Sequence, residues 1–176
     1  MKTIIIGGVA GGATAAARLR RLDEKAEIII LERGEYVSFA NCGLPYYIGG
    51  VITDREDLTL QTPESFKARF DIDVRVLNEA VKISPDSKTV TVKNLRTGET
   101  YEETYDNIIL SMGAEPIRPN IEGADGSNVF TLRNIPHSLK IKNYIDTAKP
   151  RSAVVIGGGY IGVEMAENLA EAGLKV

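Results

Sequence analysis

Cysteine and histidine are scarce in this sequence of 176 residues, which has one of each. A single cysteine excludes an intrachain disulfide framework, and with only one histidine the chain has too few sulfur and nitrogen ligands for a standard zinc site. We therefore predict no bound metal. A chain so poor in cysteine fits the reducing conditions of the cytoplasm, where we expect the protein to work.

An excess of positive charge is also missing. The 21 Lys and Arg residues against 24 Asp and Glu residues give a formal net charge of −3. A chain of this charge is a poor partner for nucleic acid, although Arg18, Arg20 and Arg21 form a local basic cluster. Because 43% of the residues are hydrophobic and 26% are charged, we expect an ordinary globular protein with a packed core.

Long apolar runs are absent as well. The mostly apolar N-terminus is interrupted by Gly7, Gly8, Gly11 and Gly12, and the basic residues 18–21 are the wrong flank for signal-peptide cleavage. No other segment approaches the roughly 18 apolar residues that a membrane span needs. We expect neither a leader nor contact with a membrane.

The first third of the chain begins with the pattern of a dinucleotide-binding unit. A β-branched run at residues 2–6 predicts a strand, the alanine-rich residues 11–24 predict a helix, and an apolar run from Glu27 to Glu32 predicts a second strand. Such a unit places the helix N-terminus against a pyrophosphate.

The glycines of this unit have separate expected roles. Gly7 makes the tight turn after the strand, and Gly12 lets the helix approach it. Glu32 lies 20 residues past Gly12, where a carboxylate accepts hydrogen bonds from ribose hydroxyls. Val9 stands in the place of the middle glycine of the G-x-G-x-x-G pattern, so we expect the pyrophosphate to lie slightly farther off.

The only cysteine lies within residues 38–47, Ser-Phe-Ala-Asn-Cys-Gly-Leu-Pro-Tyr-Tyr. Asn41 and Gly43 flank Cys42, and Pro45 follows, which is typical of the entry to a helix. Free amide groups and the helix dipole favour a thiolate there. The alternative is a small buried hydrophobic residue. We interpret the segment as a redox loop with Cys42 as its candidate nucleophile.

The middle of the chain predicts one short helix and several strands. Thr62 is a helix N-cap with Pro63 in the first turn, and this helix runs to about Phe70. The segments that follow are expected to form an antiparallel meander covering one face of the parallel sheet. Its strands are Asp73–Val76, Ala80–Ile83, Thr89–Val92 and Tyr105–Leu110.

A second glycine pattern follows a change in composition. Residues 115–134 are rich in Pro, Gly, Asn and Asp and predict a crossover, and residues 138–147 predict a helix. A buried strand is expected at residues 153–156, directly before a full G-x-G-x-x-G match at residues 157–162. The two patterns lie 150 residues apart, and two bound dinucleotides are implied.

With these motifs the sequence resembles the flavin-dependent pyridine nucleotide-disulfide oxidoreductases. Residues 38–46, the glycine-rich residues 7–12 and Leu-Arg-Asn-Ile-Pro at 132–136 are similar to the single-cysteine branch of coenzyme A-disulfide reductases and NADH-dependent persulfide reductases. The resemblance implies an α/β Rossmann-like FAD-binding domain at 1–115, a crossover and linker helix at 116–150, and the start of a truncated NAD(P)H-binding domain at 151–176.

The same resemblance implies an enzyme that uses FAD and NADH or NADPH to reduce coenzyme A disulfide or persulfides through one redox-active cysteine. Tyr47 stands where related enzymes of the glutathione reductase type have a second cysteine, so Cys42 must form its disulfide with a substrate. Ala10 stands where single-cysteine peroxidases and oxidases typically have a histidine. An NADH oxidase and a non-catalytic flavin-binding or electron-transfer fragment remain the alternatives. The parent is expected to be a homodimer, and these 176 residues alone to be inactive.

Site residues follow from this resemblance. Cys42 is the expected catalytic sulfur, flanked by Ser38 and Asn41. The expected cofactor-binding residues are Gly7, Ala10, Gly11, Gly12, Glu32, Val81, Ser111 and Gly113 for the flavin nucleotide, and Gly157, Gly159 and Gly162 for the nicotinamide nucleotide. Arg18 and Arg21, one helix turn apart, form either a solvated basic face or a site for coenzyme A phosphates.

Overall fold

A computed structural model describes all 176 residues. In chain order its elements are β1 (Lys2–Ile6), α1 (Ala10–Leu22), β2 (Glu27–Glu32), η1 (Asn41–Gly43), α2 (Leu44–Gly49), η2 (Arg55–Leu58), α3 (Pro63–Phe70), β3 (Asp73–Val76), β4 (Asn78–Ser84), β5 (Thr89–Asn94), β6 (Thr100–Thr104), β7 (Asn107–Leu110), α4 (Ile135–Ala148) and α5 (Tyr160–Glu171), where η denotes a 3-10 helix. The chain divides into two compact units. The first unit holds residues 1–39 and 59–113, and the second holds residues 40–58 and 114–176.

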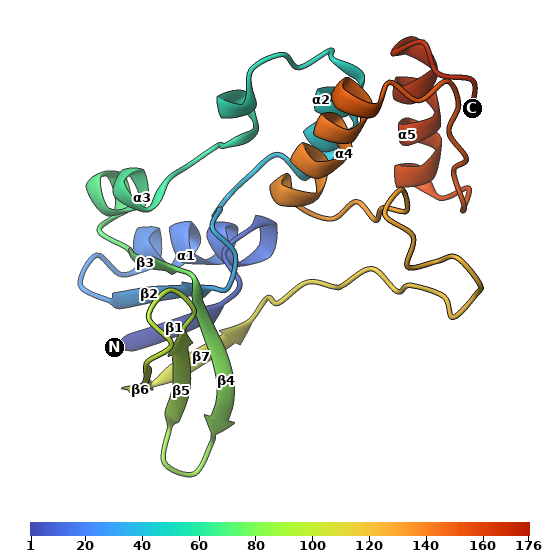
Figure 1. Cartoon of the computed structure of the whole chain (residues 1–176). Coiled ribbons are helices and arrows are strands. Elements are labelled where there is room, and N and C mark those ends of the chain that lie inside the picture. The colour runs from blue at the N-terminus through green and yellow to red at the C-terminus, as the bar shows by residue number, and fades with distance from the viewer. The chain divides into compact units, whose positions relative to one another are not determined.

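The first unit has three layers. A parallel sheet of strand order β3-β2-β1-β7 carries α1 and α3 on one side and the antiparallel sheet β4-β5-β6 on the other (Figure 1). Alternate residues of β1 separate the two cores, because Ile5 packs with the helices while Ile4 packs against Val90 and Val92 of β5. Strands buried on both faces explain the continuous apolar runs. The predicted α/β Rossmann-like fold is confirmed.

Two details of the predicted meander are wrong. β3 pairs in parallel with β2 and belongs to the main sheet, and β7 pairs in parallel with β1. The predicted strand Tyr105–Leu110 is therefore only β7, and the third strand of the meander is β6, a polar segment that the sequence did not indicate. β6 alternates exposed and half-buried residues, and its inward Tyr101 and Glu103 bond to the first sheet. The helix capped by Thr62 is confirmed, with a reciprocal Thr62–Ser65 capping box.

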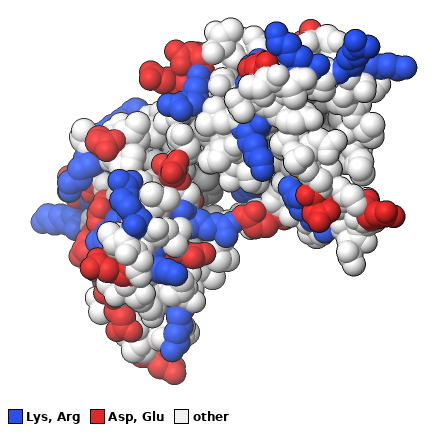
Figure 2. All heavy atoms as spheres, in the orientation of Figure 1, with Lys and Arg blue, Asp and Glu red and all other residues white.

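Ion pairs join the two sheets of the first unit. Glu103 of β6 accepts from Lys2 of β1 at 2.6 Å and from Arg75 of β3 at 2.6 Å. Arg75 also pairs with Asp73 at 2.8 Å and donates to the Tyr101 hydroxyl. Burial alone would raise the pKa of the Glu103 carboxyl, but the hydrogen bonds from Lys2 and Arg75 outweigh it and the pKa is lowered. Side chains of both signs are interspersed over the face drawn in Figure 2.

The second unit is built from helices. Figure 1 shows α2, α4 and α5 packed together, and their shared core contains Ile48 of α2, Ile141 of α4 and Met165 and Leu169 of α5. The predicted helix at 138–147 is present as the longer α4. No helix of the chain has both the length and the apolar character to cross a bilayer.

The predicted buried strand at residues 153–156 is wrong. Only Ser152 forms a bridge, with Lys175, and the side chains of Val154 and Ile156 are 88% and 84% exposed. A strand exists through pairing with neighbours, and here the only neighbouring extended segment is that around Lys175. The apolar pattern alone therefore predicted a strand where pairing is limited to one bridge.

Candidate functional site

The first glycine turn is shaped by close backbone contacts. Gly7 adopts a left-handed φ of +94°, and a Cβ there would collide with the carbonyl of Ser111 after β7. A Cβ on Gly12 would likewise collide with the carbonyl of Gly7. Both positions therefore require glycine, because the backbone that follows β1 lies in close contact with the backbone that follows β7 and with the start of α1.

Glu32 closes this turn from the end of β2. One carboxylate oxygen accepts the N–H of Gly8 at 2.8 Å, and the other accepts the N–H of Gly34 at 2.8 Å. Glu32 is 9% exposed. Each oxygen retains a second lone pair, so the carboxylate keeps acceptor capacity for a ribose hydroxyl.

Gly8 is a structural residue that the sequence analysis missed. A Cβ on it would lie 2.7 Å from a methyl of Val37 and 2.8 Å from a methyl of Ile30. The run of glycines was the available signal, but the neighbours that crowd Gly8 lie far from it in the sequence.

The start of α1 is open to a ligand. Val9, the N-cap, provides no side-chain cap, and Ala10 and Gly11 are exposed. The first N–H groups of a helix have no partner within the helix, and they attract anions together with the helix dipole. A Cβ on Gly11 would lie 3.5 Å from the Ser111 hydroxyl, so that hydroxyl stands beside the same turn.

Ser38 is tied to this turn through its backbone. It adopts a left-handed φ of +48°, its N–H donates to the Gly8 carbonyl at 2.9 Å, and its carbonyl accepts from Leu60 at 2.9 Å. Gly113 follows β7 with a φ of +71°. Val81 lies on β4 in the antiparallel sheet, where the register with β5 is irregular, and is 52% exposed.

Cys42 belongs to the second unit. It sits in the 3-10 turn η1, which runs directly into α2 with Pro45 in the first helical turn. The predicted helix entry is therefore confirmed. The cysteine is free and exposed, so its interpretation as a small buried hydrophobic residue is wrong.

The far end of α2 presses against α5. A Cβ on Gly49 would lie 2.7 Å from the side-chain oxygen of Asn168 and 3.0 Å from its carbonyl. Asn168 is 1% exposed, and its amide nitrogen donates to the Glu164 carbonyl at 2.8 Å, while its side-chain oxygen has no partner. Close contact with glycine backbone thus fixes α2 on α5.

The second glycine turn repeats the first. A Cβ on Gly162 would collide with the carbonyl of Gly157, as one on Gly12 would with that of Gly7. Gly157 has a φ of +110°, and a Cβ on Gly159 would meet no atom within 4 Å. The turn at the start of α5 is therefore open, like that at the start of α1.

The basic cluster on α1 divides into two kinds of residue. Arg20 is structural, because its guanidinium donates to the carbonyls of Phe70 at 2.7 Å and Asp71 at 2.9 Å. Arg18 and Arg21 are exposed on the same helix. Their geometry is compatible with either a solvated face or a contact with phosphates.

Arg133 is a second residue that sequence reasoning missed. Its Nε donates to the Ala114 carbonyl at 2.7 Å, and its Nη1 lies 3.5 Å from the side-chain oxygen of Asn41, next to Cys42. In the sequence, residues 132–136 contribute only to the family resemblance, and nothing in that pattern indicates a role for the arginine.

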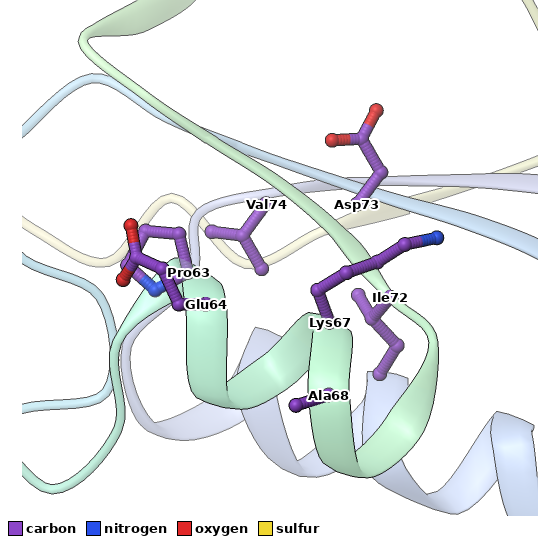
Figure 3. Close-up of a pocket in the computed structure, with 7 residues that line it drawn as sticks. All are labelled: Pro63, Glu64, Lys67, Ala68, Ile72, Asp73 and Val74. Carbon is purple, nitrogen blue, oxygen red and sulfur yellow. The ribbon is translucent and has the colours of Figure 1, made fainter.

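A groove is lined by residues 63–74, a segment that contains no predicted site residue. It runs between α3 and β3 in the first unit (Figure 3), and its lining residues are Pro63, Glu64, Lys67, Ala68, Ile72, Asp73 and Val74. None of them was predicted as a site residue. The groove is open and mainly apolar, without a convergent set of polar groups.

Comparison with known proteins gives consistent matches. The model of the pyridine nucleotide-disulphide oxidoreductase family matches residues 1–176. A coenzyme A disulfide reductase of Staphylococcus haemolyticus is 45% identical over 175 residues, which are 99% of this chain and 39% of that protein. The solved structure of reduced Bacillus anthracis CoADR-RHD is 61% identical with a TM-score of 0.95, over 98% of this chain and 31% of that one.

A NAD-dependent persulfide reductase from A. fulgidus is 38% identical with a TM-score of 0.93, over 99% of this chain and 32% of that one. The chain therefore spans well under half the length of these relatives. Its two glycine turns, its exposed cysteine at a helix entry and the match along its whole length confirm the resemblance seen in the sequence, and the chain belongs to the pyridine nucleotide-disulphide oxidoreductase family.

Proposed function

We propose that this chain is part of an FAD- and NAD(P)H-dependent enzyme that reduces coenzyme A disulfide or a persulfide through Cys42. The observation that carries the proposal is the exposed cysteine in a 3-10 turn at the entry to α2, in a chain with two open glycine turns of the same geometry. Two relatives are named for these two substrates.

The residues of the first turn fit a flavin nucleotide. The start of α1 offers uncapped N–H groups for the pyrophosphate, and Glu32 has acceptor capacity for the ribose. The residues that would hold the nucleotide are Gly7, Ala10, Gly11, Gly12, Glu32, Val81, Ser111 and Gly113. When bound, FAD supplies a two-electron relay between the nicotinamide nucleotide and sulfur. The turn of Gly157, Gly159 and Gly162 would hold that second nucleotide.

Cys42 performs the sulfur chemistry in this proposal. Its thiolate attacks one sulfur of the substrate disulfide, a Cys42–substrate disulfide forms, and the other sulfur leaves as a thiolate that takes up a proton. Two electrons, originally from NAD(P)H, and one proton then break the new bond, release the second thiol and restore the Cys42 thiolate. Ser38 and Asn41 are proposed as the polar residues that flank the sulfur in sequence, and Arg18 and Arg21 as contacts for coenzyme A phosphates.

The domain assignment accompanies this function. We propose a FAD-binding domain over residues 1–115, a linker over 116–150 and the start of a nicotinamide nucleotide domain over 151–176. The first glycine turn lies in the first of these ranges and the second turn in the last.

The test is Cys42→Ser in the full-length protein. The variant keeps nearly the same side-chain volume, so it should fold and retain flavin, while NADH-dependent reduction of coenzyme A disulfide and of persulfide falls by several orders of magnitude, since serine forms no alkoxide near neutral pH. Reoxidation of the flavin by oxygen continues. Reductase activity close to wild type in this variant would show that the sulfur is a bystander.

A further inference from the structure

The segment Leu132–Pro136 places one arginine rigidly at the start of α4. Asn134 caps that helix by accepting the His137 N–H at 3.0 Å, and Ile135 is fully buried. The residue before this cap is Arg133. The capped start of α4 therefore fixes the backbone of Arg133. The hydrogen bonds of its guanidinium fix the side chain.

The guanidinium joins two segments that are far apart in the chain. Nε donates to the Ala114 carbonyl at 2.7 Å, in the segment that follows β7 and Gly113. Nη1 reaches the side-chain oxygen of Asn41 at 3.5 Å. The short contact anchors the group, and the longer one approaches the turn that carries Cys42. A planar guanidinium with several fixed donors suits this double contact better than a lysine would.

The segment of residues 41–49, here called the cysteine segment, consists of η1 followed by α2, and its two ends are held in different ways. At its far end Ile48 is fully buried and Gly49 lies against Asn168. At its near end no residue of η1 is buried. Packing therefore holds α2 from the buried Leu44 and Pro45 onward. Asn41 and Cys42, just before it, are not buried, and the side chain of Asn41 is held by its hydrogen bond from Arg133.

We propose that Arg133 is the positioning residue of the redox loop, holding Asn41 and the Ala114 carbonyl so that the Cys42 turn keeps one geometry. The proposal rests on the proposed function of Cys42. It adds that the linker between the two predicted nucleotide-binding domains, residues 116–150, controls the reactivity of the sulfur. A turn held in one geometry presents its sulfur to a substrate in one orientation.

The test compares Arg133→Gln with Arg118→Gln in the full-length flavoprotein. Arg118 is a matched control, because it lies in the same linker and also donates to two carbonyls, those of Ala124 and Val129, but not to the cysteine segment. We expect Arg133→Gln to change the rate of Cys42 alkylation by iodoacetamide about fivefold at constant pH, because the turn that carries the sulfur loses a contact that holds it. Reduction of the flavin by NADH stays within about twofold of wild type, while turnover with coenzyme A disulfide falls about tenfold. Arg118→Gln leaves all three rates unchanged.

A double-mutant cycle with Asn41→Ala locates the effect. If Arg133 acts through Asn41, Arg133→Gln should change alkylation much less in the Asn41→Ala background than in wild type. Additive effects, an unchanged alkylation rate in Arg133→Gln, or an equal loss in Arg118→Gln would overturn the proposal. Should Arg133→Gln fail to fold, Arg133→Lys is measured in the same way. We again expect reduction of the flavin by NADH to be nearly unchanged and turnover with coenzyme A disulfide to fall. Absence of disulfide reduction by wild type would refute the proposed function, yet the alkylation cycle would still decide the role of Arg133.

Discussion

Glu32 and Gly8 are joined by a buried hydrogen bond of 2.8 Å, in which the carboxylate accepts the backbone N–H of the glycine. The sequence suggested that this carboxylate serves a ribose, and the structure shows that it also holds the turn against which a nucleotide would lie. The proposed ribose contact would therefore be made by the same side chain that shapes the turn.

Replacing Glu32 should therefore affect stability before any ligand is added. Glu32→Ala removes the acceptor for the N–H groups of Gly8 and Gly34, and an unsatisfied buried donor costs about 1–3 kcal/mol. We expect a lower free energy of unfolding in urea and a lower flavin content after purification. The control is Glu27→Ala on the same strand, where an exposed glutamate pairs with Lys2 and its loss should cost less than about 1 kcal/mol. Equal stability of the two variants would contradict this role.

A methyl group on Gly49 should disturb the packing of α2 against α5. Its Cβ would lie 2.7 Å from the side-chain oxygen of Asn168, and overpacking of this kind costs about 1–3 kcal/mol. Thermal unfolding of Gly49→Ala should show a reduced melting temperature. Gly158→Ala is the matched control, because a Cβ there meets no atom within 4 Å. If Gly49→Ala melts like wild type, the close contact between α2 and α5 does not matter for stability.

Stability should fall in mildly acidic solution because of His137. Burial lowers the pKa of its imidazole from the usual 6.5, and the charges of Lys140, Arg118 and Arg133 lower it further. The unfolded chain then binds the proton more readily than the folded one, so the contribution is complete above pH 6.5 and is lost as the pH falls through the folded pKa. Urea unfolding at several pH values should show a smaller loss in His137→Gln. An identical pH dependence in both proteins would exclude this histidine as the cause.

Glu103 should produce a second, more acidic transition. Its folded pKa lies below the usual 4.5, because the hydrogen bonds from Lys2 and Arg75 outweigh the effect of burial. The stabilisation is therefore present above pH 4.5 and lost as the carboxyl is protonated at lower pH. In Glu103→Gln the free energy of unfolding should be lower near neutral pH and change less between about pH 5 and pH 3. The neighbouring exposed Glu102 serves as the control, and a Glu102→Gln variant that behaves like Glu103→Gln would refute the assignment.

The first βαβ unit could be predicted closely from sequence because its signals are local. A β-branched run, a glycine turn and an alanine-rich helix each depend on near neighbours, and β1, α1 and β2 lie within a few residues of their predicted bounds. The polar segment Thr100–Thr104 carried no such signal, since its strand is stabilised by Glu103 and Tyr101 bonding to distant strands. The apolar residues 153–156 were a false signal, because a strand also needs neighbours with which to pair.

Some residues of the candidate site could likewise be predicted from local signals in the sequence, and others could not. The glycines and Cys42 were recognisable by type and spacing, since glycines at these intervals after a strand are typical of a nucleotide turn and a cysteine at a helix entry is typical of a reactive sulfur. Arg133 was not, because nothing local distinguishes an arginine that bonds to Ala114 and Asn41 from one that faces solvent. Its role depends on segments 19 and 92 residues away in the chain.

The interrupted course of the chain between its two units limits how relatives of this protein can be recombined. Residues 40–58 fold with residues 114–176, although they lie between two parts of the first unit in the sequence. A hybrid that exchanges only the later segment would set a foreign α5 against the native Gly49 and a foreign linker against the native Asn41. Crossovers should instead be made at three places, near residues 39, 58 and 113, so that residues 40–58, which contain Cys42 and α2, are exchanged together with residues 114–176.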